Sequence, residues 1–468
     1  MAAAGAGALR AGRPPETARD VEGGPPGRIA AARNSTGGAG LMTGGVFSAD
    51  PARNRFARVV CLLVAALGWA NIAILGRSML AENPPTAGFD LELLLTAGRR
   101  VAAGGSPYDP AAVAHGVQAR DLFYSYPPFV AQALAPFAGL PTWLVLTGWC
   151  LGAGAGLVLV AALLARSPIG RPAATPPALG LDAALLALAA APFFFPFTVA
   201  LLFGNVDAWF PLLFGAAALA LASRGVAAAR PTSIAGGVAL ALAAAVKLHP
   251  GTLVVWLAAR RPQAGTRRPH VTVIAAAIAT GISILVLSLL VGGLGPWRDY
   301  VNYLSLGSAA DLASRVNIGP ASQLALLAGD SGLARPLAFV FAGLAIVATI
   351  VAARLVRDPL ESLSWAIVAS LIVLPVTWYH YPVALIPVAL AAWTRSRGAV
   401  RARAVSLTLA AAIVVADVAI ALPVALWLAV ALLFVAVRWS RPGPVFVPLG
   451  ASDPVGADAI GPAPVLSA

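Results

Sequence analysis

Charged residues are scarce in this chain. Only 11% of its 468 residues are charged, whereas 59% are hydrophobic. A soluble domain usually carries about 25% charged residues, so one aqueous globule cannot bury this much apolar surface. The scarcity excludes an ordinary soluble fold, and the mean hydropathy of +0.83 indicates that the bilayer is the solvent.

Cysteine and lysine are nearly absent. Cys61 and Cys150 both lie in apolar runs without metal-ligand spacing, so we expect neither a disulfide between them nor a metal site. Lys247 is the only lysine, so the net charge of +13 comes from arginine. The arginines stand in small groups between apolar runs, which is typical of cytoplasmic loops. We therefore expect membrane lipids around the chain and no nucleic-acid partner.

Long apolar runs dominate what is present. A bilayer core of ~30 Å needs about 20 apolar residues per helix, and this measure gives roughly twelve spans. The fold class predicted is all-α, a polytopic membrane protein with about 12 transmembrane helices. The runs are 59–76, 140–164, 179–197, 209–222, 234–246, 253–259, 271–291, 337–351, 363–376, 383–393, 405–421 and 422–437. The short runs near 253 and 383 suit half-helices, or the second arms of hairpins bent at Pro250 and Pro382.

The distribution of charge predicts the orientation of these spans. With the N-terminus in the cytoplasm, every second connection is basic and the others hold most of the acids, as the positive-inside rule requires. Residues 1–54 and 442–468 lack apolar periodicity and predict a disordered cytoplasmic tail and a flexible C-terminal tail around a membrane domain at 55–441. Both termini are then cytoplasmic at the cell membrane. Two long outer loops, 80–139 and 292–335, are expected to contain short helices.

Asp90 stands at the start of a predicted helix, 91–103, which Gly104, Gly105 and Pro107 close. An aspartate at a helix start usually caps it by accepting backbone hydrogen bonds. A carboxylate held at the membrane surface can also act as a general base. From its position alone, the cap is favoured.

Lys247 and His380 are ionisable residues at the ends of apolar runs. His380 stands among aromatic residues, where it can simply hydrogen-bond, or can move a proton or pair with a phosphate. Lys247 is expected near the outer side, against the positive-inside preference, so it either snorkels to headgroups or has an anionic partner such as a lipid phosphate.

Weaker polar signals lie on the same predicted side. Asn205 and Asp207 form a polar island between apolar runs that also suits a turn, while Arg315 and Asn317 lie in the second outer loop. Together, a carboxylate, a histidine, cations and amides suit transfer of a group from a lipid phosphate to a hydroxyl, because a base removes the acceptor proton while cations stabilise the leaving phosphate.

Several stretches, in order, resemble glycosyltransferase family 87 of the membrane-embedded GT-C superfamily, from about residue 59 to 438. They are Phe89-Asp90 with Ala97-Gly98-Arg99, then Gly104-Gly105-Ser106-Pro107-Tyr108-Asp109-Pro110, Tyr126-Pro127-Pro128-Phe129, Gly204-Asn205-Val206-Asp207, Lys247-Leu248-His249-Pro250 and Trp378-Tyr379-His380-Tyr381. The resemblance implies a GT-C-like fold. It also implies transfer of a sugar, most often mannose, from a polyprenyl-phosphate co-substrate to a lipid-linked or cell-envelope glycan acceptor outside the cytoplasm. The configuration at the anomeric carbon is expected to invert, and no other cofactor is expected.

The resemblance also implies roles for individual residues. Asp90 becomes the catalytic base, and His380 serves near the donor phosphate. The remaining roles are donor-phosphate binding for Lys247, Arg315 and Asn317, and substrate binding for Tyr126, Asn205 and Asp207.

Three departures leave the sugar, the acceptor and activity itself open. Asp207 replaces an amide, Tyr381 stands where a second histidine is common, and Asn317 lies in a changed second-loop sequence. The alternatives are a transporter or lipid flippase, an arabinofuranosyltransferase, a glycan–lipid ligase and an inactive relative. The chain shows no two-fold internal repeat and few ionisable residues in mid-membrane, and both observations argue against a transporter.

Overall fold

The computed structural model describes residues 51–111, 124–167, 179–222, 229–261, 267–307, 312–396, 399–419 and 421–441. The two predicted tails lie outside these residues, apart from the first tail's last four. Within the described ranges the chain forms α-helices and short 3-10 helices and no β-strand, which confirms the all-α prediction.

Four of the described helices are long and apolar enough to cross a membrane. They are α1 (Pro51–Leu80), α5 (Thr142–Arg166), α11 (Arg267–Gly292) and α14 (Ala334–Leu355). A fifth span is formed if α6 (Leu179–Ala190) and α7 (Phe195–Leu202) cross together, although they are bent by 76°. Pro192 and Pro196 lie at this bend, where their rings and missing N–H groups interrupt a continuous helix. The total of about twelve spans stays a prediction.

The remaining apolar runs also form helices, most of them shorter than a full span. They are α8 (Phe210–Ala222), α9 (Ala229–Val246), α10 (Thr252–Ala259), α15 (Pro359–Val373), α16 (Ile386–Arg395), α17 (Ala399–Val418) and α18 (Val424–Trp439). As expected at Pro250 and Pro382, the 3-10 turns η4 (His249–Gly251) and η6 (Tyr381–Leu385) break the chain before α10 and α16. These breaks place polar residues between apolar helices.

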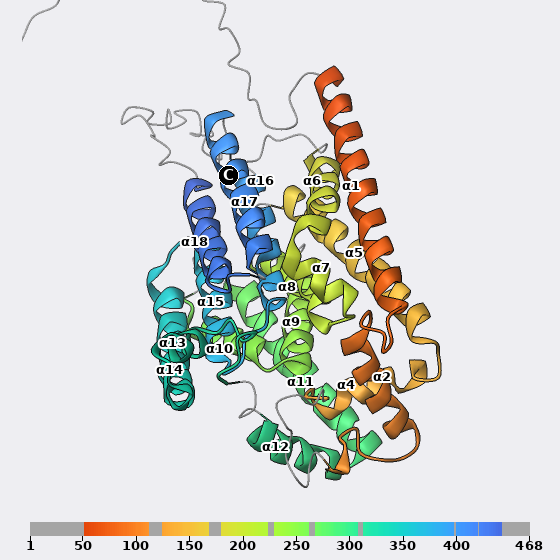
Figure 1. Cartoon of the computed structure of the whole chain (residues 1–468). Helices are drawn as coiled ribbons and strands as arrows, with labels where there is room; N and C mark the ends of the chain where they lie inside the picture. The colour runs from red at the N-terminus through yellow and green to blue at the C-terminus, as the bar shows by residue number, and fades with distance from the viewer. Residues whose placement is uncertain are drawn as a thin grey trace, which may run out of the picture. The chain divides into compact units, whose positions relative to one another are not determined.

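The two long loops that the sequence predicts on the outer side both contain short helices, as expected. The first holds α2 (Phe89–Ala102), α4 (Pro128–Leu134) and η1 (Ala135–Phe137), and the second holds α12 (Gly295–Gly307), α13 (Pro320–Ala328) and η5 (Ser331–Leu333). Helix α4 contacts both α2 and α12, and all three gather at the lower end of the bundle in Figure 1. The two loops therefore pack against each other.

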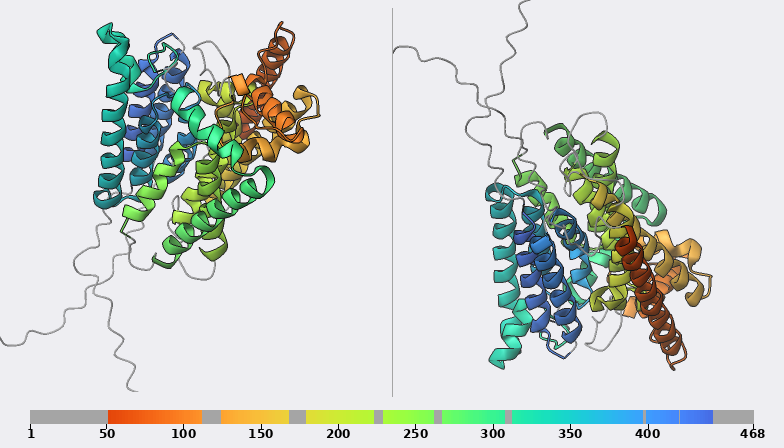
Figure 2. Two further views of the ribbon diagram at one scale, coloured as in Figure 1. Left: turned by 90° about the horizontal axis from the view of Figure 1, so that it is seen from below. Right: turned by 90° about the horizontal axis from the view of Figure 1, so that it is seen from above.

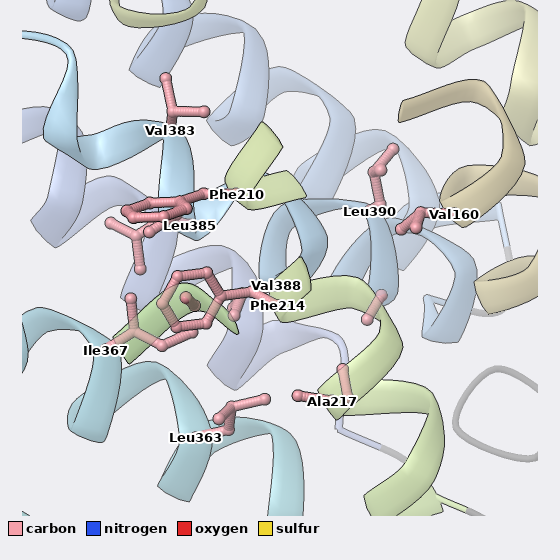
Figure 3. Close-up of a cluster of buried hydrophobic side chains, with 14 of the residues drawn as sticks. Val160, Phe210, Phe214, Ala217, Leu363, Ile367, Val383, Leu385, Val388 and Leu390 are labelled. Carbon is pink, nitrogen blue, oxygen red and sulfur yellow. The ribbon is translucent and has the colours of Figure 1, made fainter. Parts of the chain in front are cut away.

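The core lies between α5, α8, α15 and α16. Phe210 and Phe214 of α8 meet Ile367 of α15 and Val388 of α16, and all four are fully or almost fully buried (Figure 3). Small residues let the helices approach closely, as is common in membrane bundles. Gly237 of α9 is an example, because an added Cβ there would collide with the backbone of α11.

The outer helices expose apolar side chains. Leu67 on α1, Leu290 on α11 and Phe339 on α14 are each more than 70% exposed. Helices α1 and α14 lie at opposite sides of the bundle in Figures 1 and 2, so this apolar surface is not confined to one patch. Exposed apolar surface of this extent indicates a membrane-embedded protein.

Two arginine–carboxylate ion pairs join neighbouring helices near arginine-rich segments of the chain. Arg58 of α1 pairs with Asp182 of α6 at 2.8 Å. Arg395, at the end of α16, makes a two-pronged contact with Asp358, whose side chain also caps α15. Arg58 lies near the N-terminal end of α1, the end predicted to face the cytoplasm, and Arg395 begins a connection predicted to be cytoplasmic. Their carboxylates thus have structural partners.

Candidate active site

Helix α2 is fixed by its backbone to the end of α7. The Gly88 N–H donates to the Leu202 carbonyl at 2.7 Å, and the N–H groups of Asp90 and Leu91 donate to the Phe203 carbonyl at 2.9 and 3.1 Å. These carbonyls satisfy donors that a capping side chain would otherwise take. The capping interpretation of Asp90 is therefore wrong: Gly88 holds the cap position, and the Asp90 carboxylate is left for other contacts.

The Asp90 carboxylate meets the polar turn that follows α7. Asn205 Nδ2 donates to Asp90 Oδ2 at 2.6 Å. Asn205 Oδ1 accepts from the Asp207 N–H at 3.0 Å and lies 3.5 Å from Lys247 Nζ. The turn expected from sequence is present, and its amide joins α2 to the end of α9.

Lys247 is paired within the protein. Its Nζ lies 2.8 Å from Oδ1 and 2.9 Å from Oδ2 of Asp207, and 3.9 Å from the centre of the Tyr381 ring. The Asp207 side chain is completely buried and that of Lys247 is 10% exposed. A buried carboxylate needs such a partner. Lys247 therefore does not snorkel to headgroups, and the anionic partner in this structure is Asp207.

His380 completes the cluster from the segment between α15 and α16. Its Nε2 lies 3.5 Å from Asp207 Oδ2 and has no hydrogen-bond partner among the described residues. The ring is buried and meets the Tyr381 ring edge-on, with centroids 5.0 Å apart. The expected aromatic surroundings of His380 are confirmed, and the imidazole lies next to the Lys247–Asp207 ion pair.

Tyr126 belongs to an aromatic cluster that joins the two long loops. Its backbone carbonyl accepts from the Tyr108 hydroxyl at 2.7 Å, and the Tyr108 ring packs on Tyr300 and Tyr303 of α12. The Tyr126 hydroxyl lies 3.5 Å from Asn205 Nδ2. Both loops thus support the polar cluster through Tyr126, which is itself buried.

Asn317 and Arg315 lie in the second long loop, in different surroundings. Asn317 is fully buried: its Oδ1 accepts from the Thr377 N–H at 2.9 Å, and its Nδ2 donates to the Pro375 carbonyl at 3.0 Å. It therefore fastens this loop to the segment that leads to His380. Arg315 is exposed. Their roles at a donor phosphate stay predictions.

Asp90 is the more accessible of the two carboxylates in the cluster. It is partly exposed, whereas Asp207 is fully buried. Burial raises the pKa of the Asp90 carboxyl, while the Asn205 hydrogen bond and the Lys247 charge lower it and the Asp207 charge raises it. A reachable carboxylate with a raised pKa is suited to take a proton.

No three His, Cys, Asp or Glu side chains in the described parts of the chain are grouped so that they could hold a metal ion. The polar cluster has two carboxylates, and Lys247 already neutralises one of them. The expectation of a metal-free site stays a prediction.

Residues 124–378 match the family model of glycosyltransferase family 87. The chain belongs to this family. A search of curated proteins found no match. The matched stretch is shorter than the resemblance at 59–438. It contains the Asn205–Asp207 turn and Lys247, whereas Asp90 precedes it and His380 follows its end by two residues.

Six of the predicted site residues come together in this family 87 glycosyltransferase. They are Asp90, Tyr126, Asn205, Asp207, Lys247 and His380. Four parts of the chain that are distant in sequence supply them: α2, the segment before α4, the region from the end of α7 to the end of α9, and the segment between α15 and α16. Asn317 lies beside the cluster, on the chain that holds His380.

Sequence reasoning assigned no role to Tyr381 and His249. The centre of the Tyr381 ring lies 3.9 Å from the Lys247 ammonium, and the His249 ring stacks on Tyr381 with centroids 5.6 Å apart and an interplanar angle of 15°. The Ser370 hydroxyl donates to the Ile367 carbonyl, so it accepts from His249 Nδ1–H at 3.3 Å. The sequence could have pointed to both residues, because His249 lies two positions after Lys247 and Tyr381 directly follows His380.

Proposed function

We propose that this membrane glycosyltransferase moves a sugar, with mannose as the first candidate, from a polyprenyl-phosphate donor to a hydroxyl of a lipid-linked or cell-envelope glycan acceptor. The active site faces the outer side of the cell membrane. The observation that carries this proposal is the Asp90 carboxylate, partly exposed and held by Asn205 beside the buried Lys247, Asp207 and His380 cluster.

In the proposed reaction, Asp90 takes the proton of the acceptor hydroxyl. The acceptor oxygen attacks the anomeric carbon as the bond from that carbon to the donor phosphate oxygen breaks. Polyprenyl phosphate leaves, and the configuration inverts. His380, whose buried Nε2 lies 3.5 Å from Asp207 Oδ2 and has no hydrogen-bond partner among the described residues, is assigned to the side of the site where the phosphate leaves. A positioned base contributes about 10²–10⁴-fold to such a rate.

An apolar cavity supports a donor that carries a lipid. It has a volume of about 320 Å³, and its lining side chains are apolar except for Ser406. Pro382 in its wall is two residues from His380, and the cavity continues between α6, α16, α17 and α18. A hydrocarbon chain is favoured in such surroundings, because its burial removes apolar surface from water.

The test is transfer by purified protein in lipid nanodiscs. Tritiated mannose on polyprenyl phosphate is offered with a membrane lipid extract as acceptor, and GDP-mannose is offered in parallel. We expect labelled lipid product from the polyprenyl-linked donor only. Labelled product from GDP-mannose alone would refute the donor assignment.

The transporter alternative predicts a different result. Proteoliposomes would move a solute, or flip the labelled lipid across the bilayer, without forming a new glycosidic bond. Mass spectrometry of the lipid fraction separates the outcomes, because transfer changes the mass of the acceptor by one hexose and transport changes no mass.

A further inference from the structure

The amide of Asn205 lies between the Asp90 carboxylate and the Lys247–Asp207 ion pair. Nδ2 donates to Asp90 Oδ2 at 2.6 Å, whereas Oδ1 accepts from the Asp207 N–H at 3.0 Å and lies 3.5 Å from Lys247 Nζ. Asn205 is only 3% exposed. Both ends of the amide are therefore occupied by protein groups.

The neighbours impose the orientation of this amide. Two donors, the Asp207 N–H and the Lys247 ammonium, lie on one side, so the amide oxygen must face them. The reverse orientation would set the NH₂ group against those donors and the amide oxygen against the Asp90 carboxylate. The NH₂ group of Asn205 therefore has to face Asp90.

The backbone of Asn205 is fixed as well. Its N–H donates to the Ala200 carbonyl at 2.8 Å, and its carbonyl accepts from Trp149 Nε1 at 3.2 Å. On the opposite side, the N–H of Asp90 is bound to the Phe203 carbonyl. The donor and the carboxylate that accepts from it are thus both attached to the end of α7, which keeps their separation constant.

We infer that Asn205 is a positioning residue for the general base: it holds one oxygen of the Asp90 carboxylate in its charged form and so aims the other at the acceptor hydroxyl. This inference rests on the proposed function, in which Asp90 is the base. It differs from the substrate contact that the sequence suggested for Asn205, because the amide already has protein partners at both ends.

The other ionisable groups that face Asp90 come from four elements. They are Asp207 of η3 (Val206–Trp209), Lys247 after α9, Tyr126 before α4 and Tyr381 of η6. Burial and Asp207 raise the pKa of Asp90, and Asn205 and Lys247 lower it. Since Asn205 binds the charged form, its loss raises this pKa.

Two variants remove the N–H donor in different ways. Asn205→Leu removes the amide at similar volume, and Asn205→Asp keeps an oxygen for the Asp207 N–H, so that the turn survives. In Asn205→Asp two carboxylates share a site and hold a proton to still higher pH. Thr96→Val, on the same helix as Asp90, is the matched control, because Thr96 bonds Glu92 and Arg99 instead.

The first readout is an infrared titration of the protonated Asp90 carboxyl in nanodiscs, with its band identified by its loss in Asp90→Asn. We expect the midpoint to rise by about 1–2 pH units in Asn205→Leu, to rise further in Asn205→Asp, and to stay constant in Thr96→Val. An unchanged midpoint in both variants overturns the inference. This titration needs no turnover, so it decides the role of Asn205 even for a protein that transfers no sugar, a result that would refute the proposed function alone.

The second readout is the pH profile of transfer. We expect the acidic limb of kcat to move to higher pH by the same amount, with KM for the donor unchanged, because the base must still be deprotonated. A loss of rate that is equal at every pH, or a rise in KM with an unchanged profile, contradicts the inference and favours a structural or substrate-binding role.

Discussion

The Lys247–Asp207 pair yields the sharpest stability prediction. Lys247→Met keeps the apolar stem of the side chain but leaves the Asp207 carboxylate, which is completely buried, without its cation at 2.8 Å. Removal of one partner from a buried pair costs about 3–5 kcal/mol, because the remaining charge is desolvated and unpaired. The lost contact of the ammonium with the Tyr381 ring at 3.9 Å adds about 0.5–2 kcal/mol.

The assay is reversible unfolding in mixed detergent micelles, followed by tryptophan fluorescence. Arg100→Met is the matched control, since its pair with Asp109 is at 2.7 Å but exposed, and such pairs contribute about 0.2–1 kcal/mol. Lys247→Met with Asp207→Leu should recover most of the loss, because an apolar pair replaces the ionic one. Equal, small losses for Lys247→Met and Arg100→Met would refute the buried pair.

Two further predictions concern the supports of the site. Gly204→Ala should lower the stability more than Gly104→Ala. Both glycines have a positive φ, but a Cβ added at Gly204 would lie 2.6 Å from the Leu91 Cβ, whereas no atom lies within 4 Å of a Cβ added at Gly104. Unfolding midpoints in the same micelles compare them, and equal shifts would contradict the close packing. Asn317→Ala should speed amide hydrogen exchange around Thr377 by at least about tenfold, because it removes two hydrogen bonds that together contribute at least about 1.5 kcal/mol. An unchanged exchange rate would show that Asn317 does not hold that segment.

The sequence predicted most helices because apolar runs in a membrane have few alternatives to helix. It predicted Gly104 as a terminator of α2 correctly, and the N–H groups of Gly104 and Gly105 bind the carbonyls of Val101 and Arg100. It did not predict that α6 and α7 bend by 76°, because a proline in an apolar run signals a break but not its angle.

The residues of the polar cluster could be singled out from the sequence, but their contacts with one another could not. Asp90 looked like a cap because local sequence does not reveal that carbonyls at the end of α7 satisfy the first turn of α2. From the sequence, Lys247 was expected to bind headgroups or an anion such as a lipid phosphate. Its anionic partner is instead Asp207, which lies 40 residues earlier, and only tertiary packing brings Asp207 Oδ1 to 2.8 Å from Lys247 Nζ. Contacts between distant elements carry no local signal in one sequence.

The role of Asp90 is tested most directly by the rate of sugar transfer from a polyprenyl-phosphate donor in Asp90→Asn and Glu92→Gln proteins. Both changes neutralise a carboxylate on α2, but Glu92 is already bound to Arg99 and Thr142. We predict that Asp90→Asn lowers kcat by about 10²-fold or more while Glu92→Gln stays within a few fold of the unaltered enzyme. A folded Asp90→Asn protein that transfers sugar at the unaltered rate would contradict the account.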